Sequence, residues 1–415
     1  MRIGFAALIV FSFVANSALN VFGQSTVLDN ATFFSTSFEV NDAVYDATRD
    51  VVFATTPSSV GDALGNRLLE INPTNGAVIN STIVGSEPNQ LAISSDGSRI
   101  YIGIDGDRGV RLFSPDTGAL GAIAPITDRF STPAVAEDIA VSPGFPDSVV
   151  VSRDTVGSSG NGNPEVFNVT GTTLTSTFSS TGDDNIFSFL NSNTLFGFNR
   201  STTAFSGRLY DFDGQTITLD SSQSRLISIS QLEVEAGNDG RIYFTNGLVL
   251  DGSDLTPEET FNTGLDSALA VVEPVPALGL TYFAGPASFQ GSAVILNVFD
   301  NETFALIDSV PLSGIISIDF RGELIVAGEN RLALIARASG SGFSGPRVLT
   351  FISNIPVRGL ILGDANQDGV VNFSDIPAFI AVLQTGAFLA EADVNQDGEV
   401  NFSDIPAFIE VLMGG

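Results

Sequence analysis

Two short segments near the end of the sequence carry the residues best suited to chemistry. They run from Asp364 to Asp375 and from Asp393 to Asp404, and each contains Asp and Asn at regular spacing. The second segment begins 29 residues after the first, and the similarity between the copies extends past both segments. In the stretches 366–383 and 395–412 the copies differ at only two positions. The segments are therefore an internal duplication.

Oxygen-bearing residues in each copy fall at the spacing of a calcium-binding EF-hand loop. Ca²⁺ prefers six to eight oxygen ligands, which Asp, Asn and backbone carbonyl groups supply. Loop position 6 is Gly in both copies, because the sharp turn there needs a positive φ. The predicted ligands are Asp364, Asn366, Asp368, Val370, Asn372 and Asp375 in the first loop, and Asp393, Asn395, Asp397, Glu399, Asn401 and Asp404 in the second. The pattern predicts two Ca²⁺ ions and folding that is coupled to metal binding.

A short amphipathic helix is predicted after each loop. Ser374 and Ser403 can cap the two helices, and each helix has a Pro in its first turn, where the missing N–H costs nothing. Apolar residues then recur at i, i+3, i+4 and i+7. These stripes are Ile376, Phe379, Ile380 and Leu383 in the first helix, and Ile405, Phe408, Ile409 and Leu412 in the second. Two such stripes can pack together with pseudo-twofold symmetry.

From about Ile361 to Met413, the repeats resemble a type I dockerin, a family with Asp rather than Glu at loop position 12. The resemblance implies a small all-α domain that binds Ca²⁺ and a cohesin domain on another protein, commonly in polysaccharide breakdown. The family's recognition pair lies at positions 10 and 11, which are Phe373-Ser374 and Phe402-Ser403 here. A Phe at position 10 departs from the small hydroxyl pair often found there. The two Phe side chains therefore either contact a partner or pack in the domain's own core.

The missing residue types exclude several kinds of chemistry. The 415 residues include no Cys and no His, which excludes disulfides, thiolate sites, His-ligated zinc and Ser-His-Asp catalysis. The net charge of -30 has the wrong sign for binding nucleic acid or an anionic membrane. Glycoside hydrolysis by two carboxylates remains open, with candidates at Asp183–Asp184, Asp211–Asp213 and Glu233–Glu235. Each pair falls where turns or exposed strand faces are expected, which favours ordinary solvated acids.

The first residues of the chain have the features of a secretory signal. Met1-Arg2 precedes an apolar run from Ile3 to Val14, and small residues follow. We expect cleavage after Gly23 and a secreted protein that is extracellular or associated with a cell surface. A retained membrane anchor is the alternative, but Asn and Ser interrupt the run well short of the roughly 20 apolar residues that span a bilayer.

Between Asn30 and Pro356 the sequence predicts β structure, with two kinds of apolar run in alternation. The first kind occurs seven times, at 50–53, 98–102, 147–151, 193–196, 240–244, 280–283 and 330–334. The second follows about fifteen residues later and ends in a turn, at 69–76, 112–118, 166–171, 210–214, 249–252 and 298–302, with 348–351 as a seventh member that lacks the turn. A repeat of about 46 residues with about four strands predicts a seven-bladed β-propeller. A series of β-sandwiches is the alternative fold.

The segment Ala31–Phe38 has no blade of its own, so we expect it to complete the last blade and close the ring. Turns at 94–98 and 114–118 resemble those of propellers of the lactonase and YVTN-repeat kind. The expected organisation is a signal peptide over 1–23, a propeller over 24–356, a linker over 357–362 and the dockerin-like domain over 363–415.

Three functions agree with these features, and the first is favoured. It is a secreted calcium-binding protein whose dockerin-like module mediates cohesin-type assembly, while the propeller is a platform for a protein, polysaccharide or cell-surface ligand. The second is a polysaccharide-degrading enzyme, a carboxylate-dependent hydrolase of O-glycosyl bonds that the dockerin targets. The third is a structural protein that the calcium sites stabilise and that binds no partner.

Overall fold

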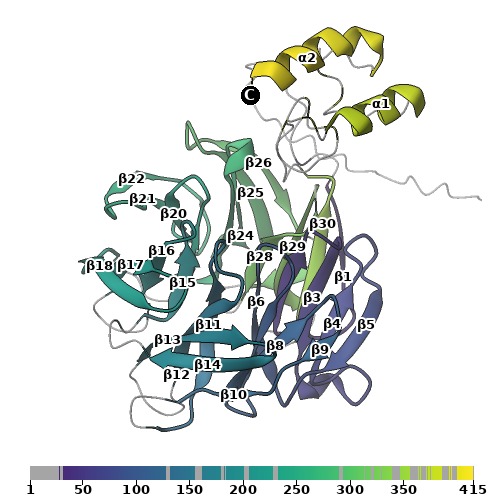
Figure 1. Cartoon of the computed structure of the whole chain (residues 1–415). Coiled ribbons are helices and arrows are strands. Elements are labelled where there is room, and N and C mark those ends of the chain that lie inside the picture. The colour runs from purple at the N-terminus through teal and green to yellow at the C-terminus, as the bar shows by residue number, and fades with distance from the viewer. Residues whose placement is uncertain are drawn as a thin grey trace, which may run out of the picture.

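The structure is a computed structural model of the whole chain (Figure 1). It describes residues 28, 31–127, 131–154, 161–178, 182, 184–200, 205–227, 232–288, 293–312, 314–318, 322–328, 330, 331–338, 346–355, 363, 365, 371, 373, 375–385, 392, 394 and 400–414. The predicted signal peptide and the predicted linker lie outside these residues. Within the described part of the chain, no helix has the length and apolar character needed to cross a membrane.

Seven antiparallel sheets make up the described part of the chain before the C-terminal helices. The strands of the first four sheets are β2 (Asp42–Asp46), β3 (Val51–Thr56), β4 (Arg67–Ile71) and β5 (Val78–Ile83) in blade 1; β6 (Pro88–Ile93), β7 (Ile100–Ile104), β8 (Gly109–Ser114), β9 (Ala119–Leu120) and β10 (Ala124–Pro125) in blade 2; β11 (Val135–Val141), β12 (Ser148–Asp154), β13 (Asn161–Thr170) and β14 (Thr173–Phe178) in blade 3; and β15 (Ile186–Phe189), β16 (Thr194–Phe198), β17 (Gly207–Phe212) and β18 (Ile217–Gln223) in blade 4.

The strands of the other three sheets are β19 (Val234–Ala236), β20 (Arg241–Phe244), β21 (Leu248–Asp251) and β22 (Pro257–Thr260) in blade 5; β23 (Val271–Val275), β24 (Leu280–Pro286), β25 (Val294–Asp300) and β26 (Leu306–Pro311) in blade 6; and β27 (Ile315–Ser317), β28 (Glu323–Val326), β29 (Arg331–Ala338), β30 (Arg347–Ser353) and β1 (Thr32–Ser35) in blade 7. Short 3₁₀ turns lie at Ser58–Val60, Ser267–Leu269 and Pro276–Leu278.

The seven sheets are the blades of a propeller. Their innermost strands, β2, β6, β11, β15, β19, β23 and β28, contact one another in that order, and β28 contacts β2 again. The first kind of predicted run is the second strand of every blade, and the second kind is the third strand. The predicted seven-bladed propeller is therefore confirmed, and a series of β-sandwiches is wrong.

The ring closes through a strand from the beginning of the described chain. β1 pairs antiparallel with β30, from Thr32 opposite Ser353 to Ser35 opposite Thr350 (Figure 1). Phe34 stacks on Phe351 across this pairing, with ring centroids 5.2 Å apart. The expectation that this segment completes the last blade is confirmed.

The apolar second strands lie at the centre of each blade and are covered on both sides. Every residue of β3 and of β7 is buried, because neighbouring blades pack against both faces of a blade. Such strands show a continuous apolar run rather than the alternation of a half-exposed strand. This explains why the second strands were the clearest repeat in the sequence.

The C-terminal helices follow the two predicted loops. They are α1 (Asp375–Thr385) and α2 (Ile405–Gly414), and the 3₁₀ turn η6 (Phe402–Asp404) leads directly into α2. Phe379 and Phe408 stack face to face between the helices, with ring centroids 3.9 Å apart and planes 5° apart. Because these two residues are equivalent in the repeats, the stack places the contact near the pseudo-twofold axis of the duplication.

Candidate functional site

Two parts of the molecule bring together residues that can do chemistry: the C-terminal loops and the centre of the propeller ring. In the C-terminal part, Asp375 and Asp404 are 0% exposed, and both sit where a loop meets a helix. The sequence from residue 359 to 415 contains no Lys, Arg or His, so this segment has no cationic side chain of its own to offset two buried carboxylates. Burying such charge costs several kcal/mol unless a cation compensates it. The donor set therefore fits Ca²⁺, which takes carboxylate and carbonyl oxygens.

Of the twelve predicted ligands, Asp375, Asn401 and Asp404 are described, and the other nine lie outside the described residues. Among the described residues there is no group of three or more acidic side chains close enough to hold a metal ion. The ligand set and the number of ions accordingly remain predictions.

A capping box fixes the start of the second helical segment. The Asn401 side chain accepts a hydrogen bond from the Ser403 N–H at 2.8 Å, and the Asp404 carboxylate accepts one from the Asn401 N–H at 2.9 Å. The cap residue is therefore Asn401, and the prediction of Ser403 as the cap is wrong. Asn is as good a cap as Ser, and the helical turn begins two residues earlier than predicted. Ser374 lies outside the described residues.

The apolar stripes of the two helices are only partly buried. Phe379 and Phe408 are in the core, where Ala365, Ala392 and Val394 are also buried. Ile380 and Ile409, at equivalent positions of the two helices, are largely exposed. The predicted inward stripe is therefore wrong at these two positions, because a two-helix core is too narrow to cover four apolar positions on each helix.

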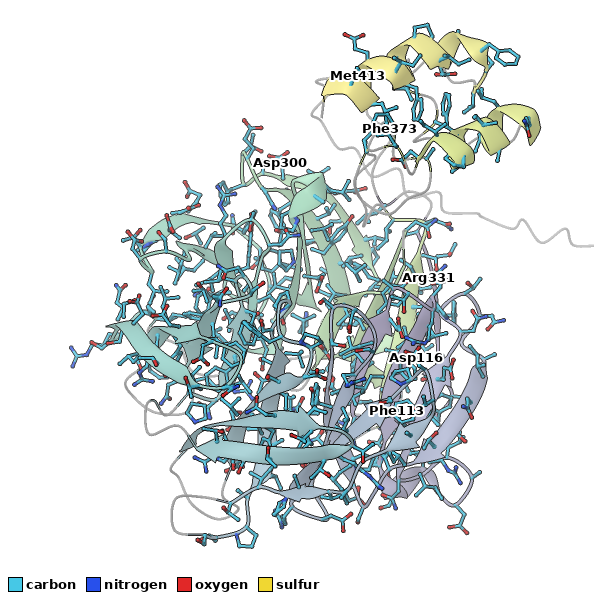
Figure 2. The ribbon with its side chains drawn as sticks, viewed as in Figure 1. Phe113, Asp116, Asp300, Arg331, Phe373 and Met413 are labelled. Carbon is cyan, nitrogen blue, oxygen red and sulfur yellow. The ribbon has the colours of Figure 1, made fainter. Side chains whose placement is uncertain are left out.

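Phe373 and Phe402 are the most exposed aromatic side chains in the described part of the chain, at 70% and 77%. Ser403 is also exposed, and so is Met413 at 73%. Figure 2 shows where Phe373 and Met413 lie in the C-terminal part. The interpretation that places the two Phe side chains in the core is therefore wrong. An exposed Phe leaves apolar surface in water, which is typical of a contact site.

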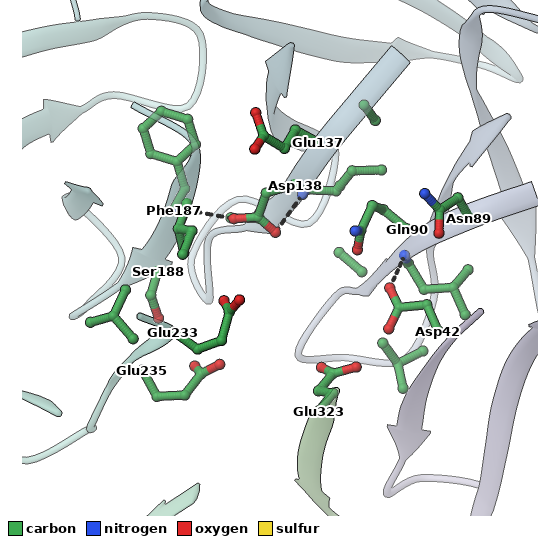
Figure 3. Close-up of a pocket in the computed structure, with 18 of the residues that line it drawn as sticks. Asp42, Asn89, Gln90, Glu137, Asp138, Phe187, Ser188, Glu233, Glu235 and Glu323 are labelled. Carbon is green, nitrogen blue, oxygen red and sulfur yellow. Dashed lines mark hydrogen bonds between the residues drawn. The ribbon is translucent and has the colours of Figure 1, made fainter. Parts of the chain in front are cut away.

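The second cluster lines a cavity of about 580 Å³ at the centre of the ring. Each blade except blade 6 contributes polar or charged side chains to it, and Figure 3 shows them around the cavity. The acidic members are Asp42, Asp105, Glu137, Asp138, Asp154, Glu233, Glu235 and Glu323. The lining of this cavity, which is the central channel of the ring, is thus strongly acidic.

One arginine balances part of this charge. The Arg200 guanidinium forms an ion pair with Glu233 and a longer one, at 3.8 Å, with Glu137. Asn185 donates to Glu137 at 2.7 Å. Burial nevertheless raises the pKa of Glu233 to about 7, because Arg200 offsets only part of the desolvation and the Asp138 charge adds to it.

Two of the aspartates join neighbouring blades. The Asp42 carboxylate accepts a hydrogen bond from the Leu91 N–H at 2.6 Å, and the Asp138 carboxylate accepts one from the Phe187 N–H at 2.6 Å. In both cases the donor lies on the innermost strand of the next blade. Burial raises the pKa of Asp138 to about 6, although the N–H groups of Phe187 and Ile139, which donate to it, oppose the rise. These side chains hold the innermost strands in register.

Three glutamates, Glu235, Glu273 and Glu323, lie on the consecutive innermost strands β19, β23 and β28. Burial, reinforced by the Asp138 and Glu233 charges, raises the pKa of Glu235 to about 8. Burial also raises the pKa of Glu273 and Glu323 well above the usual range, and neighbouring carboxylates add to both shifts. At neutral pH Glu235 therefore favours the protonated form, in which a carboxyl group can donate a hydrogen bond.

The carboxylate pairs named from the sequence lie in different environments in the structure. Glu233 and Glu235 line the channel, and Asp184 is 0% exposed, hydrogen-bonded to Tyr210 and paired with Arg208. The expectation of ordinary solvated acids is wrong for these three residues. Asp211 and Asp213 are exposed, as expected, and Asp183 lies outside the described residues. Asp42, Asp138 and Glu323 could not be recognised as cavity residues from the sequence, because they lie on strands of three different blades that only the closed ring brings together.

The comparison with solved structures identifies the class of fold. The chain is similar to the structure described as U3-55K (TM-score 0.53, 11% identity, 79% of this chain and 100% of that chain) and to the Myceliophteria thermophila Cps50 (Swd1) β-propeller domain (0.54, 12%, 78% and 98%). It is also similar to the RRP9 WD40 repeats (0.52, 11%, 80% and 99%). At these identities the similarity defines the propeller fold alone.

The C-terminal part has a more specific relationship. Residues 362–412 match the family described as the Dockerin type I domain. The chain therefore combines a seven-bladed β-propeller with a C-terminal type I dockerin domain. No curated protein matches the chain in sequence.

Proposed function

We propose that this is a secreted assembly protein: its dockerin domain binds a cohesin domain on another protein when Ca²⁺ is present, and its propeller presents a ligand-binding platform. The observation that carries the proposal is the match of residues 362–412 to the type I dockerin family. The buried Asp375 and Asp404 support the calcium dependence, since their own segment has no cationic side chain. Two Ca²⁺ ions would be held by the twelve ligands predicted above.

The docking surface is centred on the exposed Phe373 and Phe402, flanked by Ser374 and Ser403. These Phe residues lie at equivalent positions of the two repeats, so either repeat can present the same apolar group to a partner. Full burial of a Phe side chain contributes about 1.5–3 kcal/mol, which corresponds to roughly 10- to 100-fold in affinity. We therefore expect the partner to offer an apolar pocket where other dockerins present hydroxyl groups.

The test is the binding of the full chain to an immobilised type I cohesin domain, with Ca²⁺ and with a chelator. We expect retention with Ca²⁺ and release on chelation. Replacing both Phe373 and Phe402 by Ser should weaken binding at least tenfold, whereas Ile83→Ser, which removes an exposed apolar group from the propeller, should have no effect. No calcium-dependent retention on any cohesin would favour the purely structural function instead.

Secretion, with cleavage after Gly23, belongs to the same proposal, because an assembly module of this kind works outside the cell. Mass spectrometry of the protein recovered from the medium tests it: the mature chain should begin at Gln24. The propeller would then be the domain that the dockerin attaches to a partner, with residues 357–362 as the linker between the two domains. Its lactonase or YVTN-repeat subtype stays a prediction from the turns of blades 1 and 2.

A second candidate function for the propeller is hydrolysis of O-glycosyl bonds in the channel. The observation that favours it is the raised pKa of Glu233, about 7, and of Glu235, about 8, because a general acid must be protonated near neutral pH. Release of reducing ends from plant polysaccharides by the wild-type protein, lost in Glu235→Gln, would support it. Equal release of reducing ends by both proteins would show that Glu235 is not the general acid.

A further inference from the structure

Blades 7 and 1 meet at a seam, which we define as the boundary between their innermost strands β28 and β2. The chain enters blade 7 as β1 and then passes through residues 36–41 into blade 1. The ring is closed by the short pairing of β1 with β30 and by the contacts across this seam. Arg347, on β30, donates to the Asn41 carbonyl oxygen at 3.2 Å and to its side-chain Oδ1 at 3.0 Å, which ties blade 7 to the start of blade 1.

Two carboxyl groups face each other across the seam. Asp42 lies on β2 and Glu323 on β28, and their side chains are directed toward each other in Figure 3. The Asp42 carboxylate already accepts from the N–H groups of Ala43 at 2.8 Å and Leu91 at 2.6 Å. A hydrogen bond between this carboxylate and the facing Glu323 needs a proton, because two ionised carboxylates are both acceptors. With Asp42 held as an acceptor by two backbone donors, the proton resides on Glu323.

The surroundings disfavour a second negative charge at this point. Arg347 is the cation that acts on Asp42, whereas Glu235 on β19 and Glu273 on β23, where they are ionised, oppose a charge on Glu323. Asp138 on β11 interacts with Asp42 through the same cavity, and Asp105 lines it as well. Glu323 Oε2 is buried and has no hydrogen-bond partner in the described part of the chain. Ionisation of Glu323 would therefore create an uncompensated charge beside Asp42.

We propose that the seam between blades 7 and 1 is a proton-dependent closure, in which one proton between Asp42 and Glu323 holds the first and last blades together. Loss of that proton turns a hydrogen bond into a repulsion between two carboxylates, at the point where the ring is closed by non-covalent contacts. The closure is a property of the propeller and is independent of docking by the C-terminal domain.

The direction of the pH dependence follows from the two pKa shifts. Burial raises the pKa of Asp42 and raises that of Glu323 well above the usual range of about 4. The folded state therefore binds more protons than the unfolded chain, and the stabilisation is fully present below the unfolded pKa. It is lost as the pH rises through the pKa of the folded state, so the seam is tightest in acid and weakens toward alkaline pH.

Hydrogen exchange of the full chain at pH 6 and pH 9, at constant Ca²⁺, tests this proposal. After correction for intrinsic exchange rates, peptides covering β1, β2 and β30 should lose protection by up to about tenfold for each pH unit between the pKa of Glu323 in the open, solvated state and its raised pKa in the folded state, and the loss should level off above the latter. Peptides covering β16 and β17 of blade 4 report on the part of the ring away from the seam and should change less.

The variant Glu323→Gln should remove the effect, because its amide donates to Asp42 at every pH. Asp42→Asn replaces the first variant if that one does not fold. It should also remove the pH dependence, because its amide carries no charge and can accept from Leu91, although it loses the hydrogen bond from Ala43. Glu302→Gln, at an exposed turn of blade 6, is the control and should behave as wild type. The proposal is overturned if the wild-type seam keeps its protection at pH 9, or if both amide variants lose protection as the wild type does.

Discussion

Removing one ring of the Phe379–Phe408 stack should raise the calcium concentration that the dockerin domain needs to fold. Phe408 is 4% exposed, and its ring centroid lies 3.9 Å from that of Phe379, in a core whose other fully buried side chains are smaller. The change Phe408→Ala leaves a cavity in that core. Phe402→Ala is the matched control, because it removes the same side chain from the same repeat at a position that is 77% exposed.

The size of the shift follows from the linkage between folding and binding. A buried Phe→Ala replacement costs about 3–5 kcal/mol, which is a large part of the stability of so small a domain. If two ions bind as the domain folds, each tenfold rise in free Ca²⁺ adds about 2.7 kcal/mol of stability. A loss of about 4 kcal/mol therefore raises the calcium midpoint by roughly 30-fold.

The assay is the far-UV circular dichroism of the full chain during a calcium titration, with the spectrum in chelator subtracted so that the propeller contribution cancels. Wild type and Phe402→Ala should share one midpoint, and Phe408→Ala should titrate at the higher concentration. A midpoint that is the same for all three proteins would refute the coupling of this core to calcium. A shift in Phe402→Ala equal to that in Phe408→Ala would refute the distinction between core and surface Phe.

Three further predictions concern the propeller, and each is read from the midpoint of chemical denaturation. Arg153→Ala removes a fully buried guanidinium 3.8 Å from Glu165 and should destabilise the protein by about 3–5 kcal/mol, because Glu165 loses its compensating charge. Gly197→Ala places a methyl group 2.6 Å from the Asp184 carboxylate and should cost about 1–3 kcal/mol through overpacking. Glu235→Gln should flatten the fall in stability between pH 6 and 9, since the stabilisation from a pKa of about 8 is present in acid and lost above it.

The predictions for Arg153 and Glu235 each have a control at an exposed position. Arg225→Ala removes an exposed arginine and should change stability by less than about 0.5 kcal/mol. Glu302→Gln should leave the pH profile of the wild type intact. An Arg153→Ala protein as stable as Arg225→Ala would contradict the role of the buried ion pair. A Glu235→Gln profile as steep as that of wild type would contradict the raised pKa.

The blades could be predicted from the sequence because their signals are local. The continuous apolar run of a second strand, such as β7, results from burial on both faces, and turn residues such as those at 114–118 mark where a third strand ends. The ring closure by β1 could be inferred because one strand was left over at the start of the repeats, while the last blade lacked the turn that would lead to an outer strand. These features depend on neighbours in the chain, so the sequence contains them directly.

The channel could not be predicted for the opposite reason. Asp42, Asp138 and Glu323 lie on strands of three different blades, and only the closed ring brings them into one cavity. In the sequence of a strand, an acidic residue that faces the channel alternates with apolar residues in the same way as an acidic residue that faces solvent. The exposure of Phe402 could not be predicted either, because a Phe suits a buried core and a docking surface equally well. Its exposure is decided by the narrowness of the two-helix core.

The position of β30 within blade 7 affects how the molecule would carry a mechanical load. β30 leads toward the dockerin domain, and it lies between β29 and β1 rather than at the edge of its sheet. Tension from a docked partner would therefore act along a strand that is hydrogen-bonded on both sides, so two ladders must shear together before the strand can leave. One of these ladders is the closure of the ring, so a pull on the anchor is shared between the first and last strands of the propeller.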